Sequence, residues 1–145
     1  MDAHLIADVK QAEGCKLEAY KDSLGYWTIG YGHLLDQDKD WQGYTITQDN
    51  AEAWLINDLQ QTYLRCTHLP EWASLDTLCR QNAVIELMFN MGGKWLKFYK
   101  TRLDISHQDW KSAHDDLLNS LWAKQVGKKR SERLATYLLE GQYKA

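Results

Sequence analysis

Residues 13–33 read EGCKLEAYKDSLGYWTIGYGH and place two acidic side chains, Glu13 and Asp22, and the hydroxyl of Thr28 in a segment with the residue types of a small sheet. The DSLG sequence that begins at Asp22 is a turn signal. After it, polar or glycine residues alternate with larger apolar residues, which is the period of a β-strand. The segment therefore predicts a hairpin or small sheet over about 17–34, with polar groups where a core strand is expected.

Helical patterns flank this segment on both sides. Residues 2–13 suit a short helix that Gly14 stops, which places Glu13 in the last turn. Beyond the sheet, apolar residues recur at three- and four-residue spacing over 47–66, 75–91, 110–122 and 130–139. One helix, a small sheet and then helices only predict an α+β fold that is mostly α, with its strands segregated into a small N-terminal lobe.

Length and composition restrict the class of protein. The chain has 145 residues, the size of a single domain, and no apolar run long enough to span a membrane. Its first residues are acidic and lack the apolar core of a secretory signal, so we expect a cytoplasmic protein without a signal peptide. Three cysteines without a metal-binding spacing predict reduced thiols and no metal site.

The net charge of −3 is unevenly distributed along the chain. Residues 1–73 carry five basic and twelve acidic side chains, whereas residues 74–145 carry twelve basic and eight acidic ones. A basic half favours contact with an anionic polymer, either nucleic acid or cell-wall material, and is equally typical of a solvated helical face. No nucleic-acid recognition motif accompanies it, so we expect no nucleic-acid partner.

Glu13 and Asp22 have the residue types of an acid–base pair. Glycoside hydrolysis needs an acid that protonates the leaving oxygen and a carboxylate that attacks or activates water. The partial negative charge at a helix C-terminus disfavours the ionised form of Glu13, whereas backbone amides in a polar turn keep Asp22 ionised. Thr28, beside Gly30 and Gly32 on a bare strand surface, is suited to hold a water. On spacing alone, these residues are also those of an ordinary helix end, turn and strand.

His33 and Asp58 both fall on positions that the patterns place toward the core. His33 is in phase with Trp27 and Ile29, and Asp58 lies inside the apolar stripe of its helix. A buried acid without a partner is costly. We therefore expect His33 and Asp58 to form an ion pair with a structural role.

The segment as a whole resembles the active-site segment of the bacteriophage T4-type lysozymes, the phage endolysin muramidases. Their motif is a Glu followed by Gly, an Asp nine residues on, a Thr six residues further, and then Gly-x-Gly-His. This chain matches that motif at Glu13, Asp22, Thr28 and 30–33. The resemblance continues over 47–58, 83–92 and 120–122, and at Arg130 and Arg133.

This resemblance implies a lysozyme-like fold. The small β lobe is expected over 14–46 and the larger helical lobe over 1–13 and 47–145, with the active-site cleft between them.

The resemblance also implies the roles of individual residues. Glu13 is expected to be the general acid, and Asp22 and Thr28 to position the attacking water in an inverting cleavage. The bond is expected to be the β-1,4 link between N-acetylmuramic acid and N-acetylglucosamine. Sugar contacts are implied at Leu34, Phe89, Thr101 and Asp116, and the His33–Asp58 pair is a family feature. No metal or organic cofactor is implied.

The expected partner is the glycan strand of peptidoglycan, met by a monomer that reaches the wall from the host cytoplasm after a holin opens the membrane. No membrane insertion is expected. Two alternatives remain open from the sequence: a lysozyme domain of a phage tail, and a lytic transglycosylase, against which the presence of Asp22 and Thr28 argues.

Overall fold

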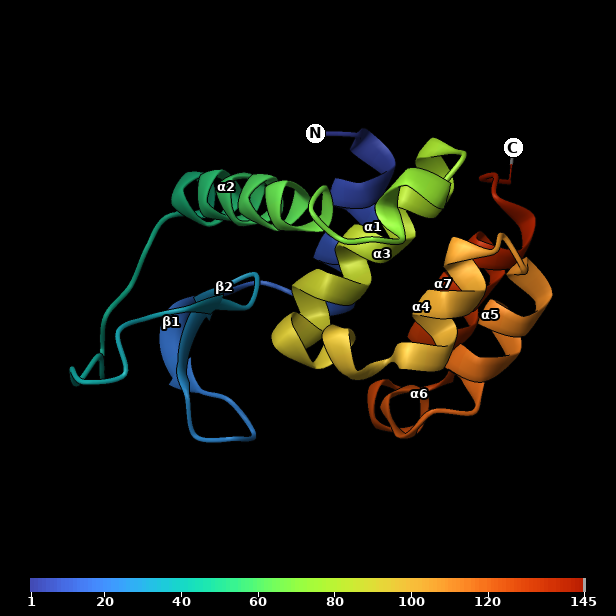
Figure 1. Cartoon of the computed structure of the whole chain (residues 1–145). Helices are drawn as coiled ribbons and strands as arrows, with labels where there is room; N and C mark the ends of the chain where they lie inside the picture. The colour runs from blue at the N-terminus through green and yellow to red at the C-terminus, as the bar shows by residue number, and fades with distance from the viewer. Residues whose placement is uncertain (145) are drawn as a thin grey trace. The chain divides into compact units, whose positions relative to one another are not determined.

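A computed structural model describes residues 1–144 as a mostly helical chain with one small antiparallel sheet (Figure 1). The predicted α+β fold class is confirmed. The chain divides into two compact units, residues 1–61 and the residues from 62 onward. These bounds differ from the lobes expected from the resemblance, which stay a prediction.

The first unit contains the sheet and the helices that surround it in sequence. Asp2 caps the first helix by accepting hydrogen bonds from the backbone N–H groups of His4 and Leu5. Thr47 caps the second helix, because its hydroxyl oxygen accepts from the N–H of Asn50. The elements are α1 (Ala3–Glu13), β1 (Lys16–Lys21), β2 (Trp27–Gly30), β3 (His33–Leu34) and α2 (Gln48–Cys66), the last of which runs on into the second unit.

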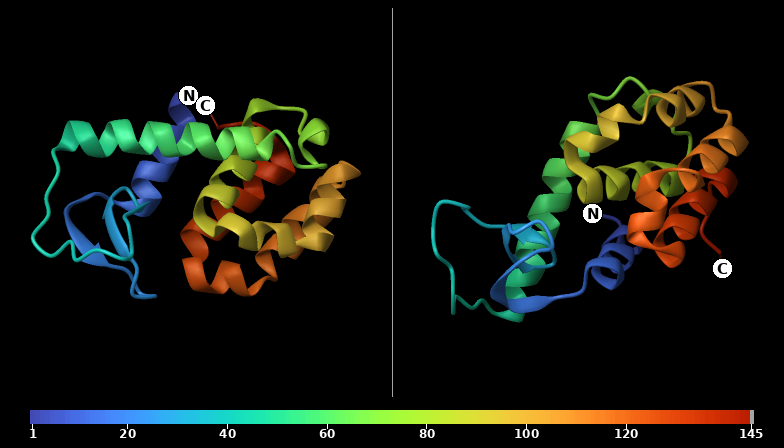
Figure 2. Two further views of the ribbon diagram at one scale, coloured as in Figure 1. Left: turned by 60° about the vertical axis from the view of Figure 1, so that its left-hand side comes forward. Right: turned by 90° about the horizontal axis from the view of Figure 1, so that it is seen from below.

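The three strands are antiparallel in the order β1-β2-β3. The alternation predicted through His33 is interrupted, because Tyr31 and Gly32 form the turn between β2 and β3. Ile29 lies opposite His33 across this turn. After β3, a long connection loops away from the sheet (Figure 2). It returns before α2 begins, because Thr45 forms a bridge with Glu18 of β1.

The second unit contains helices and connecting turns, with no strand among its described residues. Its elements are η1 (Trp72–Ser74), α3 (Leu78–Met91), η2 (Gly92–Lys97), α4 (Tyr99–Ser106), α5 (Trp110–Leu118), α6 (Leu121–Val126) and α7 (Lys128–Glu140). Helix α3 is buried around most of its circumference, as its apolar sequence predicts. Helix α5 packs against both α4 and α7.

Two predictions for this unit were incomplete. The stripe over 110–122 is divided between α5 and α6, because the Ser120 hydroxyl donates to the carbonyl of Leu117 and accepts from the N–H of Ala123, which caps a new helix. Helix α4 was not predicted, because only Thr101 and Ile105 of its residues are buried.

Two buried carboxylates hold the second unit together. Glu86 on α3 is 1% exposed and accepts from Arg130 Nε at 3.0 Å and from Arg133 at 2.8 and 2.9 Å, both of which belong to α7. Glu71 is equally buried and accepts from Trp95 Nε1 and from two guanidinium nitrogens of Arg102. Each carboxylate is thus paired and hydrogen-bonded, the condition under which burial of a charge is tolerated.

The three cysteines are free thiols in different surroundings. Cys15 is exposed, whereas Cys66 and Cys79 are buried. Burial raises the pKa of the Cys66 thiol to about 12. Among the described residues, no helix has the length and apolar character needed to cross a bilayer.

Candidate active site

Glu13 is the last residue of α1, as the helical pattern predicts. The helix stops because Gly14 adopts a positive φ of 67°, and its N–H still bonds to the carbonyl of Lys10. The Glu13 side chain is half-buried, and its carboxyl group lies against the backbone of Gly32, in the turn between β2 and β3. The proposed proton donor therefore sits on the sheet of its own unit.

Gly30 and Gly32 have structural roles that differ from the role predicted for them. A Cβ on Gly30 would lie 3.5 Å from the Cβ of Ala51 and 3.6 Å from Cδ1 of Ile46, so this glycine admits close packing by α2. A Cβ on Gly32 would lie 3.4 Å from Oε1 of Glu13. The expectation of a bare strand surface at both glycines was wrong, because protein groups occupy the space beside each of them.

Gly32→Ala is expected to lower both stability and activity. Gly32 has a φ of +74°, where a side chain costs about 1–3 kcal/mol, and the new methyl group would press on the Glu13 carboxyl. Urea unfolding and a glycan-cleavage assay measure the two effects. The matched control is Gly43→Ala, which has a φ of +80° and no atom within 4 Å of the new methyl group. Equal behaviour of the two variants would contradict the close approach at Gly32.

Asp22 organises the turn between β1 and β2. Its Oδ1 atom accepts hydrogen bonds from the backbone N–H groups of Leu24 and Tyr26, both at 2.9 Å. Its own backbone N–H donates to the carbonyl of Tyr26 at 2.9 Å. Both side-chain bonds are on Oδ1, which leaves Oδ2 for a further donor such as water.

Thr28 lies in the middle of β2 and is 3% exposed. Its hydroxyl donates to the carbonyl of Tyr26 at 2.9 Å. Because the hydroxyl hydrogen is used in this bond, Oγ1 has only acceptor capacity left. A water at Thr28 must therefore point one hydrogen at Oγ1.

A row of three residues crosses the sheet at Thr28. Tyr20 on β1 is directly opposite Thr28, and Leu34 on β3 is directly opposite it on the other side. Directly opposite residues of antiparallel strands share a face. Leu34 is 60% exposed. The structure thus brings Thr28 and Leu34 together.

Tyr20 is the site residue that the sequence interpretation missed. Burial raises the pKa of its phenol, and the negative charges of Glu13 and Asp22 raise the pKa further. Tyr20 therefore lies close enough to both Glu13 and Asp22 for their charges to act on its phenol. The period-two pattern gives the face of each strand but not its partner, so the pairing of Tyr20 with Thr28 could not be predicted from it.

His33 and Asp58 are in direct contact. His33 Nδ1 lies 2.7 Å from Oδ2 of Asp58, and both side chains are mostly shielded from solvent. The ring of Trp54 packs on the imidazole, with the ring centroids 4.8 Å apart. This contact ties β3 to α2 within the first unit, in keeping with the structural role expected for the pair.

The remaining predicted sugar contacts belong to the second unit. Thr101 on α4 and Asp116 on α5 line one open pocket of about 460 Å³. The other lining residues are Lys97, Phe98, Tyr99, Lys100 and Asn119. Phe89 is half-buried on α3 and does not line this pocket.

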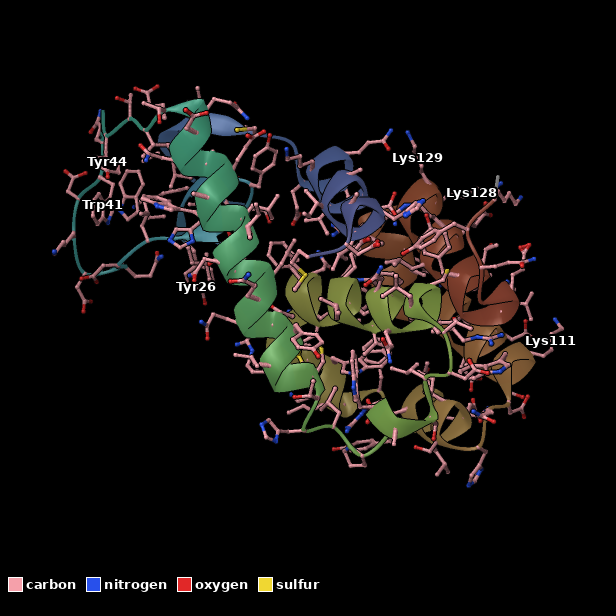
Figure 3. The ribbon with its side chains drawn as sticks, turned by 90° about the horizontal axis from the view of Figure 1, so that it is seen from above. Tyr26, Trp41, Tyr44, Lys111, Lys128 and Lys129 are labelled. Atoms are coloured by element: carbon pink, nitrogen blue, oxygen red, sulfur yellow. The ribbon has the colours of Figure 1, made fainter. Side chains whose placement is uncertain are left out.

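The basic excess of the second unit lies partly on outward-facing helix surfaces. Lys111, Lys128 and Lys129 point away from the helices that carry them (Figure 3). Two of them pair with acids one turn along their own helix, Lys111 with Asp115 and Lys128 with Glu132. Such pairs are typical of a solvated helical face.

Figure 3 also shows the aromatic side chains of Tyr26, Trp41 and Tyr44 on the first unit.

The described residues contain no cluster of three or more His, Cys, Asp or Glu side chains arranged to hold a metal ion.

Comparison with known proteins identifies similar chains. The phage lysozyme family model matches residues 10–136. The endolysin of Salmonella phage P22 is 30% identical over 125 aligned positions, which cover 85% of this chain and 82% of that endolysin. Probable T4-type lysozyme 1 of Dictyostelium discoideum is 29% identical over 158 positions, 92% of each chain. The pre-baseplate central spike protein Gp5 of Enterobacteria phage T4 is 27% identical over 92% of this chain, but only 27% of the spike protein is covered.

Proposed function

Because this chain belongs to the phage lysozyme family, we propose that it is a muramidase that hydrolyses the β-1,4 bond between N-acetylmuramic acid and N-acetylglucosamine in peptidoglycan, with inversion at the anomeric carbon. The observation that carries the proposal is the arrangement around one small sheet. Glu13 lies against the turn at Gly32, Asp22 closes the β1–β2 turn, and Thr28 lies between them in the strand.

The proposed reaction uses each of these groups once. Glu13 gives its proton to the glycosidic oxygen as the bond from that oxygen to the anomeric carbon breaks. A water attacks the anomeric carbon from the opposite face. One of its hydrogens points at Thr28 Oγ1, which can only accept, and the other is taken by Asp22. The products are a hemiacetal of inverted configuration, a free hydroxyl on the leaving sugar, and a proton moved from Glu13 to Asp22.

We propose sugar contacts at the four residues that the family resemblance implies. Leu34 presents an exposed apolar side chain in the Thr28 row, and Thr101 and Asp116 line the pocket of the second unit. Phe89 on α3 is included on the family resemblance.

The products of purified peptidoglycan test the proposal. Proton NMR during the first turnovers should show the α-anomer at the new reducing end, and mass spectrometry should show hydrated ends. Anhydro ends would instead identify a lytic transglycosylase, and a β-anomer would contradict inversion.

Asp22→Asn is expected to abolish most cleavage while the fold persists. The amide oxygen can still accept from the N–H groups of Leu24 and Tyr26, so the turn is kept, but the amide cannot take a proton from water. We expect a loss of about 10²-fold or more with an unchanged circular dichroism spectrum. The control is Asp38→Asn in the exposed connection after β3. Retained activity in Asp22→Asn would remove Asp22 from the mechanism.

The biological setting that we favour is host cell lysis by a free monomer that reaches the wall once a holin has opened the membrane. The supporting observation is the similarity to endolysins, among them that of phage P22 at 30% identity. Expression with and without a holin tests this, since lysis that needs the holin fits an endolysin. Incorporation into phage tails would favour the second setting.

A further inference from the structure

Two carboxyl groups on the packed helices α4 and α5 interact with each other. Asp104 is on α4 and Asp116 is on α5. The Oδ2 atoms of both side chains are buried, and neither receives a hydrogen bond from any donor in the described part of the chain. A buried acceptor atom without a donor is costly, and a second negative charge beside it adds to the cost.

A single shared proton resolves this conflict. Two ionised carboxylates cannot hydrogen-bond each other, because neither has a hydrogen to donate. If one is protonated, its O–H donates to the other and both buried oxygens gain a partner. The pKa of Asp104 is accordingly raised to about 6, by burial first, then by the hydrogen bond to Asp116, and then by the charges of Asp116 and Asp109.

The other charged groups near the pair act in opposite directions. Asp109, the N-cap of α5, adds a negative charge that favours the shared proton. Lys100 acts against it by lowering the pKa of Asp104. Lys100 Nζ also lies 3.2 Å from Oδ1 of Asp116, on an 81% exposed side chain. One oxygen of Asp116 thus takes part in the shared-proton hydrogen bond, and the exposed ammonium group of Lys100 lies near the other oxygen.

Asp116 is also part of the wall of the open pocket in the second unit. At about 460 Å³ the pocket lies within the range of about 300–1,000 Å³ typical of small-molecule sites. A carboxylate oxygen in such a wall accepts hydrogen bonds from sugar hydroxyl or amide groups. Asp104 does not line the pocket, so its effect on a ligand must pass through Asp116.

We propose that Asp104 is a positioning residue that fixes the Asp116 carboxyl in the pocket wall by sharing one proton with it, and that this pocket takes a neutral N-acetylhexosamine unit most tightly while the proton is present. This inference rests on the proposed muramidase function. Once the proton is lost, the two carboxylates repel each other, and Asp116 is no longer held where the sugar meets it.

The pair has a defined pH dependence. The folded-state pKa of about 6 exceeds the ordinary value of 3.8, so the folded chain holds this proton where the unfolded chain has lost it. The stability that the shared proton contributes is present at low pH and is lost as the pH rises through about 6. Sugar binding in the pocket should weaken over the same interval.

Binding of tetra-N-acetylglucosamine to the full chain tests the proposal. The Glu13→Gln background limits cleavage, and amide chemical shifts of Lys97–Thr101 and Asp116 report on the pocket. Between about pH 5 and about pH 7.5 we expect the dissociation constant to rise about two- to tenfold, the equivalent of one hydrogen bond. Adding Asp104→Asn, whose amide donates at every pH, should make the affinity independent of pH. Adding Asp115→Asn, which removes the same charge from α5 outside the pair, should keep the wild-type pH dependence.

Three results would overturn the proposal. One is the same pH dependence with and without Asp104→Asn. Another is the absence of shifts at Lys97–Thr101 and Asp116 at either pH, even if the chain cleaves peptidoglycan. The third is carboxyl ¹³C titration in which Asp104 ionises at its ordinary value. Failure of the muramidase proposal is seen separately, as loss of cleavage with normal sugar binding and a normal Asp104 titration.

Discussion

Glu13→Gln is expected to reduce the rate of peptidoglycan cleavage by at least about 10²-fold, the lower range of general-acid catalysis. Glutamine preserves the size of the side chain that lies against Gly32, but it has no proton to give to the leaving oxygen. The measurement is turbidity clearing of outer-membrane-permeabilised cells, together with reducing ends released from purified peptidoglycan.

The matched control for this variant is Glu18→Gln. Glu18 is an exposed glutamate on the neighbouring strand β1, so its replacement by glutamine is the same chemical change at a different position. We expect it to keep near-wild-type activity. Near-wild-type lysis by Glu13→Gln would show that the proton comes from another group, and the assignment of the whole site would fail with it.

Glu86→Ala is expected to have the largest effect on stability, about 3–5 kcal/mol. The substitution removes the acceptor of both Arg130 and Arg133 and leaves two guanidinium groups without the carboxylate between α3 and α7. Urea unfolding followed by tryptophan fluorescence measures the loss. A marginally stable chain could unfold altogether, which the same titration would show as a missing transition.

Glu132→Ala is the comparison for Glu86→Ala. Glu132 is an exposed acid on α7 with one long ion pair of 3.8 Å to Lys128. Exposed pairs of this kind contribute about 0–1 kcal/mol. If both alanine variants lose the same small amount, the buried network does not stabilise the second unit as its geometry indicates.

Local signals in the sequence predicted much of the fold. The helix end at Glu13 is recognisable because Gly14 follows it, and the cap at Thr47 because the residue type and the helical stripe agree. Asp22 could be placed in a turn because the DSLG sequence is a turn signal. The structure shows the reason, since the Asp22 side chain bonds to N–H groups two and four residues on. These features depend on residues that are close together in the sequence, so a local sequence pattern is enough to predict them.

Features set by tertiary contacts could not be predicted in the same way. The roles of Gly30 and Gly32 depend on Ala51 and Glu13, which approach from other elements. Tyr20 joins the site through the register of β1 on β2, and a two-residue strand such as β3 has no period of its own. Asp104 follows Thr101 by three residues, which places it near the same face of α4, but its partner is on another helix.

The contrast among the three thiols has a practical consequence for labelling. Cys66 and Cys79 are buried, and the high pKa of Cys66 keeps it from forming the reactive thiolate, so a maleimide or nitroxide reagent meets Cys15 first. Cys15 lies two residues beyond Glu13. The native chain therefore offers one addressable attachment point for a spectroscopic reporter beside the proposed proton donor, with no engineered cysteine.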